Sequence, residues 1–229
     1  MSATSVSIDI WSDVMCPWCI IGYKQLQTAL TELDGEIAAG IRWRPFELNP
    51  DMAPEGEDSA EHVQRKYGRS PEQAATSRAQ MSEIAARAGY SFAYSGEGEE
   101  PKPRIWNSFL LHKLLTHALR AHGPGAQTRL KLALFDAHFQ ERRDMSDRAA
   151  LAEIYEGVGL PRHEAEIAFD DPVLAELVRA EEAQAWDMNI SGVPAMVVNG
   201  KYLIPGAQEP ATYVDALRRV VARETRAAG

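Results

Sequence analysis

The chain contains two cysteines, and they stand three residues apart in the motif Cys16-Pro17-Trp18-Cys19. Residues 6–11, just before the motif, alternate apolar and polar side chains as a half-buried strand does. After it, apolar residues recur at helical spacing as far as residue 33. A C-x-x-C motif between a predicted strand and a predicted helix is typical of sites that exchange thiols and disulfides. We therefore interpret the motif as the active site.

The position of the motif suits this chemistry. Cys16 would stand just before the first helical turn, where free backbone N–H groups and the helix dipole favour a thiolate. Pro17 fits the first helical position, because its missing N–H would have no acceptor there. Cys19 would lie one turn further on, facing the same side and more buried. This predicts that Cys16 attacks and that Cys19 resolves the mixed disulfide.

A metal site is the main alternative for a cysteine pair. Zinc needs about four ligands, so histidines would have to supply the other two. His112, His117 and His122 are spaced five apart, which does not place them on one helix face as a spacing of four would. We therefore predict no metal site.

The order of the remaining elements predicts the fold. A second strand over 41–46, stopped by Asn49-Pro50, completes a β-α-β unit, for which a right-handed crossover is expected. Residues 51–59 are rich in proline, glycine and acids and are interpreted as a linker. A mainly helical pattern then runs to about residue 187, interrupted by a loop over 90–104. It predicts helices over residues 70–89, 105–121, 128–142, 148–157, 162–169 and 171–186.

The C-terminal segment returns to strands. Residues 195–199 and 201–204 are predicted to form a hairpin around Asn199-Gly200, followed by a helix over 210–223. The whole order predicts an α/β, thioredoxin-like fold (β-α-β … β-β-α) with a large all-helical domain inserted between its two halves. The predicted boundaries are 1–55 for the N-terminal half, 56–187 for the insertion and 188–229 for the C-terminal half.

The motifs together resemble the DsbA-like thioredoxin superfamily, most closely its cytoplasmic FrnE-like branch. Gly192-Val193-Pro194, just before a strand, is one of the specific matches, and the cysteine motif is the other. The frequency of cis X–Pro bonds alone would favour a trans Val193–Pro194 bond, whereas thioredoxin topology favours cis. The resemblance extends over residues 12–19, 43–50, 107–109 with His112, 134–139, 192–194 and 206–208.

This resemblance implies roles for individual residues. It assigns Cys16 and Cys19 to catalysis and places a cis-proline loop opposite them. In such proteins the residue before the proline offers its backbone to an extended substrate segment, so Val193 and Pro194 become substrate-binding candidates. Pro17 and Trp18 join them as residues between the cysteines, with plain packing as the alternative for Trp18.

Polar residues near the motif have less specific interpretations. Asp13 is a candidate for proton transfer, or could raise the pKa of Cys16 by like-charge repulsion, with a simple turn carboxylate as the alternative. His112 and His138 match family positions, yet a single histidine on an apolar helix face is usually a satisfied core residue.

Three functions compete. The first is a dithiol–disulfide oxidoreductase or isomerase that acts on protein or small-molecule thiols and disulfides through a Cys16 mixed disulfide. The second is a glutathione-dependent transferase or isomerase like the related kappa-class glutathione transferases and 2-hydroxychromene-2-carboxylate isomerases, which carry serine where Cys16 stands. The third is a non-catalytic redox-sensing or chaperone-like binding protein. The presence of both cysteines favours the first, with glutathione as a candidate co-substrate and no tightly bound cofactor.

Composition and the absence of targeting patterns limit the classes of binding partner and the cellular location that we expect. The formal net charge of −9 argues against nucleic acid and anionic membranes as partners. The N-terminal residues lack a signal-peptide pattern, and no apolar run reaches transmembrane length, so a cytoplasmic location is predicted. In a reducing compartment a lone cysteine pair is more often catalytic or sensing than structural. The sequence makes no prediction of oligomeric state.

Overall fold

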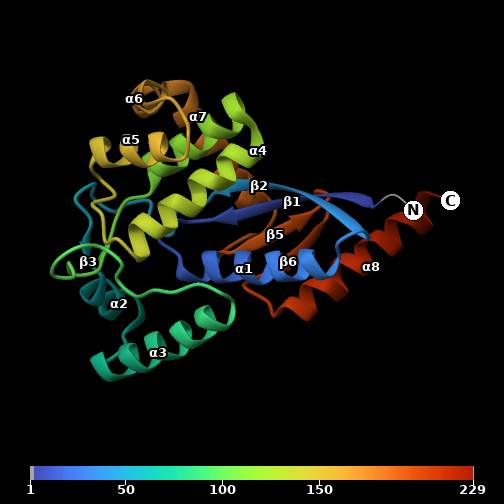
Figure 1. Ribbon diagram of the computed structural model, residues 1–229, viewed down its shortest axis with the longest axis horizontal. Helices are drawn as coiled ribbons and strands as arrows, with labels where there is room; N and C mark the ends of the chain where they lie inside the picture. The colour runs from blue at the N-terminus through green and yellow to red at the C-terminus, as the bar shows by residue number, and fades with distance from the viewer. Residues whose placement is uncertain (1–2, 229) are drawn as a thin grey trace.

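The computed structural model describes residues 3–228 and contains a four-stranded sheet in the order β2-β1-β5-β6 (Figure 1). The central strand β1 (Thr4–Ser12) runs parallel to β2 (Ile37–Pro45) and antiparallel to β5 (Ala195–Val198). The edge strand β6 (Tyr202–Pro205) pairs antiparallel with β5. Strands from the two ends of the chain therefore form one sheet, as the thioredoxin-like prediction requires. Residues 1, 2 and 229, at the outer limits of the predicted halves, lie outside the described residues.

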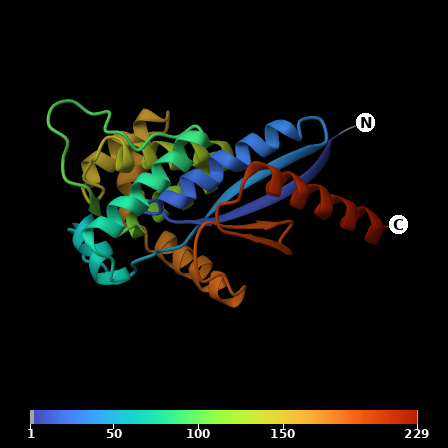
Figure 2. The same ribbon diagram turned by 90° about the horizontal axis from the view of Figure 1, so that it is seen from below.

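Helices cover both faces of this sheet. Helices α1, α4 and α8 share one buried cluster with Ile8 and Ile10 of β1, and Figures 1 and 2 show α1 and α8 lying along the sheet. On the opposite face, Ala185 of α7 packs with Trp11 and Val197. The strands of the main sheet and the helices α1 and α8 follow the predicted order, and β2 begins four residues earlier than expected. The helices are α1 (Pro17–Glu32), α2 (Ser59–Tyr67), α3 (Pro71–Arg87), α4 (Phe109–Phe139), α5 (Arg148–Gly157), α6 (Arg162–Asp170), α7 (Pro172–Asp187) and α8 (Pro210–Ala228).

The inserted segment differs from its prediction in three respects, the third of which lies in α4. It is not wholly helical, because β3 (Glu57–Asp58) and β4 (Arg104–Ile105) pair as a short two-stranded sheet. Helix α2 occupies residues that directly follow the predicted linker, and it begins where the Asp58 side chain accepts hydrogen bonds from two backbone N–H groups.

The two helices predicted over 105–121 and 128–142 join as the single kinked helix α4. The kink lies at Gly123, whose φ of 82° and ψ of 177° are not helical, and Pro124 follows it. The glycine and proline signals that predicted a break therefore produce a bend instead of a loop.

One hydrophobic core joins the sheet and the inserted helices. Ile8 and Ile10 of β1 belong to the same buried cluster as Leu114 and Leu134 of α4. The inserted helices thus bury their apolar faces on the sheet and do not enclose a separate core. None of the helices within residues 3–228 is both long enough and apolar enough to cross a bilayer.

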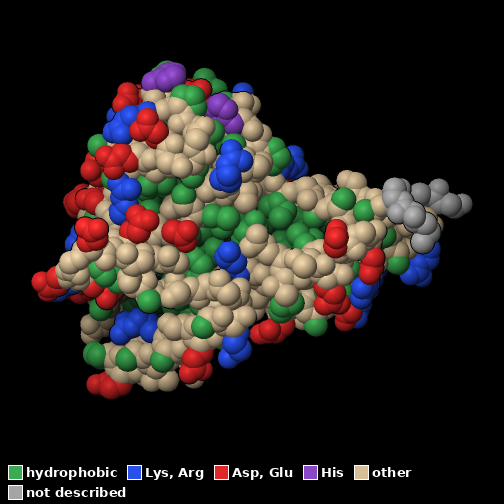
Figure 3. Space-filling view, in the orientation of Figure 1, with side chains coloured by type: hydrophobic (Ala, Val, Ile, Leu, Met, Phe, Trp, Pro, Cys, Tyr) green, Lys and Arg blue, Asp and Glu red, His purple; other side chains and the backbone are tan. Residues whose placement is uncertain are grey.

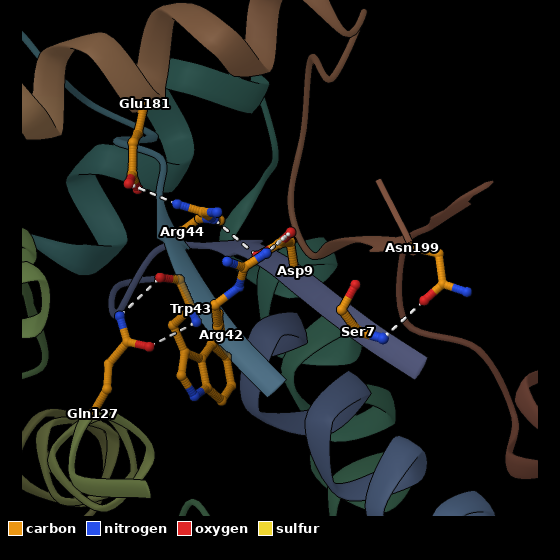
Figure 4. A network of polar contacts seen from close by, with 8 residues as sticks. All are labelled: Ser7, Asp9, Arg42, Trp43, Arg44, Gln127, Glu181 and Asn199. Carbon is orange, nitrogen blue, oxygen red and sulfur yellow. Dashed lines mark hydrogen bonds and ion pairs between the residues drawn. The ribbon is translucent and has the colours of Figure 1, made fainter. Parts of the chain in front are cut away.

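Polar contacts fix α4 and α7 against the edge strand β2 (Figure 4). The amide of Gln127 accepts from the backbone N–H of Trp43 at 2.9 Å and donates to its carbonyl at 2.8 Å. Arg44 bridges Asp9 at 2.9 Å and Glu181 at 2.6 Å. These contacts satisfy groups of the edge strand that would otherwise lack partners. They also hold α4 beside the end of the sheet that carries the cysteine motif.

The surface in the orientation of Figure 1 is mixed in character. Figure 3 shows hydrophobic side chains gathered over the middle of this face, with acidic and basic side chains scattered over the helices around them.

Candidate active site

Cys16 and Cys19 lie at the start of α1, as the sequence predicts. Cys16 is the N-cap residue with extended backbone angles, and Pro17 is the first helical residue. The N–H of Cys19 donates to the Cys16 carbonyl at 3.1 Å, closing the first turn. Both side chains are free thiols; Cys16 is 4% exposed and Cys19 is completely buried. Both sulfurs thus lie below the surface, and Cys16 is the less deeply buried of the two.

The loop before β5 lies directly against Cys16. The Cys16 thiol donates to the Val193 carbonyl at 3.6 Å, and the Val193–Pro194 peptide bond is cis. Helix α1 approaches this loop closely at Gly22, where an added Cβ would lie 3.2 Å from Cγ of Pro194. A larger residue at this position would force the loop to shift by a few tenths of an ångström, so glycine allows the close approach. No sequence pattern marked Gly22, because the contact is between segments far apart in the chain.

Trp18 projects from the turn between the two cysteines. Its side chain is 40% exposed, which makes it one of the large exposed hydrophobic residues of the described chain. Val193 is half-buried on the opposing loop. The exposure of Trp18 favours a substrate-contacting role over plain packing.

Asp13 is buried and bonded to the backbone on two sides. One carboxylate oxygen accepts from Met15 N–H at 3.0 Å and the other from Leu48 N–H at 2.8 Å. Burial raises the pKa of Asp13, whereas these hydrogen bonds and the charge of Lys131 lower it. Asp13 thus fastens the turn before Cys16 to the loop after β2, which agrees with the turn-carboxylate interpretation.

Lys131 of α4 is a residue of the site that sequence reasoning missed. It is fully buried, and its ammonium group has no hydrogen-bond partner among the described residues. The nitrogen lies 5.3 Å from the ring centre of Trp43 and 5.0 Å from that of Phe135. Burial lowers its pKa to about 8, while negative charge on Cys19, Asp13 and Cys16 opposes that change.

The charge of Lys131 acts on Cys19 in return. Burial raises the pKa of Cys19 well above its ordinary value, and the hydrogen bond and charge of Cys16 raise it further. The charge of Lys131 lowers it. The lysine therefore offsets part of the cost of forming a thiolate at the buried cysteine. A signal was present, since Lys131 lies one turn before Phe135 on the apolar stripe of its helix.

The histidines differ in burial, since His112 is buried, His117 is half-buried and His122 is exposed. Nε2 of His112 lies 4.0 Å from Asp13 and has no hydrogen-bond partner in residues 3–228. Burial lowers the pKa of His112 well below its ordinary value, so the ring is neutral. His117 and His122 both approach Glu164, at 3.9 and 2.6 Å, and are closer together than their spacing suggested, because a carboxylate of another helix bridges them. The described residues include no group of three or more side chains arranged to hold a metal ion.

An acidic pair lies near Asp13 at the junction of α7 and the loop after β2. Arg179 contacts the carboxylates of both Glu47 and Glu182. Burial, and then the charge of Glu182, raise the pKa of Glu47 to about 7. The folded protein therefore keeps a proton on Glu47 that the unfolded chain has already lost between about pH 4.5 and 7.

We expect this pair to make stability fall as pH rises through that window. Glu47→Gln should remove this pH dependence and make the variant about 1 kcal/mol more stable than the wild type at about pH 8. The expected gain is small because Arg179 already compensates part of the cost of burying the charged Glu47. Urea unfolding at about pH 5 and pH 8 measures this, with Glu176→Gln, an exposed acid of α7, as the control. An unchanged pH dependence in Glu47→Gln would contradict the assignment.

Comparison with known proteins agrees with this geometry. The model of the DsbA-like thioredoxin domain matches residues 7–218. A crystal structure of a probable DsbA oxidoreductase from Streptomyces coelicolor is 30% identical, with a TM-score of 0.83 over 95% of this chain and 90% of that one.

Two more distant relatives share most of the length. The uncharacterized protein YwbO of Bacillus subtilis is 23% identical over 89% of this chain and 91% of its own. The cytosolic disulfide reductase DsbM from Pseudomonas aeruginosa, solved with GSH, shares the fold at 17% identity, with a TM-score of 0.61 and coverage of 96% and 99%. With the family model matched from the first strand to the last helix, this chain belongs to the DsbA-like thioredoxin domain family.

Proposed function

We propose that this protein is a thiol–disulfide oxidoreductase in which Cys16 is the nucleophile and Cys19 the resolving cysteine. The observation that carries the proposal is the asymmetry of the pair. Cys16 caps a helix and lies against the Val193 carbonyl, whereas Cys19 is completely buried one turn further on. We therefore assign Cys16, the less deeply buried sulfur, to meet the substrate and Cys19 to follow it.

The reaction proceeds in two exchanges. The Cys16 thiolate attacks one sulfur of a disulfide substrate, the substrate S–S bond breaks, and one thiol leaves as a thiolate. The Cys19 thiolate then attacks the Cys16 sulfur, the mixed disulfide breaks, and the second thiol leaves. The protein is left with a Cys16–Cys19 disulfide, and two electrons have passed to the substrate. The reverse sequence oxidises a dithiol substrate.

Three groups support this sequence. Cys16 stands at the N-terminus of α1, next to the backbone N–H groups of the first turn that have no intrahelical acceptor. Lys131 favours a thiolate on Cys19, as its effect on the Cys19 pKa indicates. Val193 and Pro194, with Pro17 and Trp18 on the other side, form the surface along which an extended substrate segment would lie, in a strand-addition mode. Asp13 holds the turn in place.

Glutathione is the proposed small-molecule co-substrate, and protein thiols the alternative clients. DsbM, which shares the fold, was solved with GSH and is described as cytosolic. We extend both points to this chain as part of the proposal, with a cytoplasmic location and the FrnE-like branch as its remaining elements.

Catalysed reduction of insulin by dithiothreitol, and catalysed oxidative refolding of a reduced disulfide protein, test the proposal together. The account expects acceleration in at least one of them, and which one responds gives the direction of the reaction. A protein that accelerates neither, and that does not react with glutathione disulfide, would not be an oxidoreductase.

A further inference from the structure

A hollow of about 200 Å³ lies between the segment around β4 and the end of α4, and the proposed reaction does not use it. Its walls come from the segment around β4 and from the end of α4 with the loop that follows. They include Lys102, Arg104, Trp106, His138, Arg142 and Arg143, together with Asp144. Figure 1 places β3, the partner of β4, at the end of the molecule where α1 begins.

The hollow is connected to the attacking cysteine through Trp106 and Met15. The backbone N–H of Trp106 donates to the sulfur of Met15 at 3.4 Å, and Met15 directly precedes Cys16. The guanidinium of Arg104 lies 4.9 Å from the ring centre of Trp106. A ligand in the hollow would therefore lie against Trp106, whose backbone contacts the residue just before Cys16.

The charge in the hollow is not balanced. Arg142 pairs with Glu100 at 3.2 Å, Arg143 pairs with Glu153 at 2.7 Å, and Asp144 accepts from Ser146. Lys102 and Arg104 are exposed and have no carboxylate partner within residues 3–228, and Arg104 donates to the backbone carbonyl of Glu55 at 2.8 Å. Two cations without an acidic partner thus remain at one hollow of a chain whose formal net charge is −9.

His138 points to a ligand independently of these charges. It is 6% exposed, lines the hollow, and makes no hydrogen bond to any described residue. Burial, aided by the charge of Arg142, lowers its pKa to about 3, so the ring is neutral and carries one N–H donor. The ring nitrogens of His138 therefore have no partner among the described residues, and a ligand in the hollow would be able to accept from the ring N–H.

We propose that this hollow binds a carboxylate of a small anionic thiol or disulfide whose sulfur reacts at Cys16. The inference rests on the proposed oxidoreductase function and specifies its substrate class. Lys102 and Arg104 would form charge-assisted hydrogen bonds to the carboxylate, and His138 would donate a third. The face of Trp106 beneath Arg104 closes the hollow on its apolar side.

The size of the hollow agrees with one end of such a ligand. Pockets that enclose a whole small molecule usually measure roughly 300–1,000 Å³, so this one fits only a terminal residue. Two residues of extended peptide span about 7 Å, which is the reach from the sulfur of a cysteine-containing tripeptide to its terminal carboxylate region. The inference requires that the sulfur of a glutathione-type peptide reaches Cys16 while its terminal carboxylate occupies the hollow.

The test compares two disulfides that differ in charge. We would measure the rate at which the reduced protein is oxidised by glutathione disulfide, which carries carboxylates, and by bis(2-hydroxyethyl) disulfide, which is uncharged. The double variant Lys102→Gln/Arg104→Gln should react about fivefold to tenfold more slowly with glutathione disulfide and at an unchanged rate with the uncharged one. Unreactive S-methylglutathione should slow the wild type and have a weaker effect on the variant.

The control is Arg219→Gln/Arg223→Gln, which removes the same charge from exposed positions of α8 and should change neither rate. An unchanged rate with glutathione disulfide in the Lys102/Arg104 variant, or equal slowing with both disulfides, would overturn the inference. A wild type that reacts with neither disulfide would instead disprove the proposed function. In that case, calorimetry with S-methylglutathione would test the hollow separately from the reaction. Weaker binding to the Lys102/Arg104 variant than to the wild type would support the inference, and equal binding would overturn it.

Discussion

Cys16→Ser should abolish disulfide exchange, with activity lowered by about a thousandfold or more, because a serine hydroxyl is not a nucleophile toward disulfides at neutral pH. Cys19→Ser should keep the first exchange and lose the second. It should therefore accumulate a stable mixed disulfide on Cys16, visible by mass spectrometry as a substrate adduct that a reductant removes.

The two variants serve as controls for each other, since each replaces one sulfur by oxygen at the same helix terminus. Adducts on Cys19 in the Cys16→Ser variant, at a rate like that of the wild type, would reverse the assigned roles. Full turnover in either variant would show that the pair does not act as proposed, and turnover in Cys19→Ser alone would favour the glutathione-dependent transferase alternative.

Lys131→Met should raise the stability of the protein and at the same time slow the resolving step of its reaction. The pKa of Lys131 is lowered from 10.5 to about 8 in the folded state, so the unfolded chain binds more protons between these values. Burying the protonated lysine therefore lowers the free energy of unfolding. This loss grows as pH falls from 10.5 through 8 and reaches its full size at neutral pH. Removing the charge should raise the free energy of unfolding by about 2–3 kcal/mol at neutral pH, with the gain shrinking above about pH 8.

The same substitution should slow the resolving step. Without the charge of Lys131, the pKa of Cys19 rises further and the thiolate fraction falls about tenfold for each pKa unit. The expected signature is a normal first exchange, accumulation of mixed disulfide, and a resolving step whose pH–rate profile moves to higher pH. A purely structural lysine would not move that profile.

Leu134→Met is the matched control for Lys131→Met. It changes a buried side chain of the same helix without changing charge, so stability should alter by less than about 1.5 kcal/mol and the pH–rate profile should not move. A Lys131→Met variant that is less stable than the wild type at neutral pH would contradict the buried, unpaired ammonium.

Local patterns predicted the elements that build the sheet. Alternation over residues 6–11 and the Asn199-Gly200 turn identified β1 and the β5–β6 hairpin, and Pro17 marked the start of α1. Each of these signals involves residues that are neighbours in the sequence, so the sequence alone is enough to recognise it. The boundaries at 55/56 and 187/188 stay a prediction.

Features that depend on contacts between distant segments were missed. Residues Ala38 to Gly40 of β2 are small, are exposed or half-buried and lack a strand-like alternation, so only their pairing with β1 reveals them. Pairing of β3 with β4 joins segments nearly fifty residues apart. Gly22 and Lys131 likewise acquire their importance from the loop or side chains that pack against them.

The most direct test of the account is the redox equilibrium of the cysteine pair. The wild-type protein would be equilibrated in mixtures of reduced and oxidised glutathione, quenched with acid, alkylated and weighed intact. The account predicts that Cys16 and Cys19 lose reactivity together in one transition, with a product lighter than the dithiol by two hydrogen atoms. A pair that stays reduced throughout, or that ends as a glutathione adduct without the internal disulfide, would contradict it.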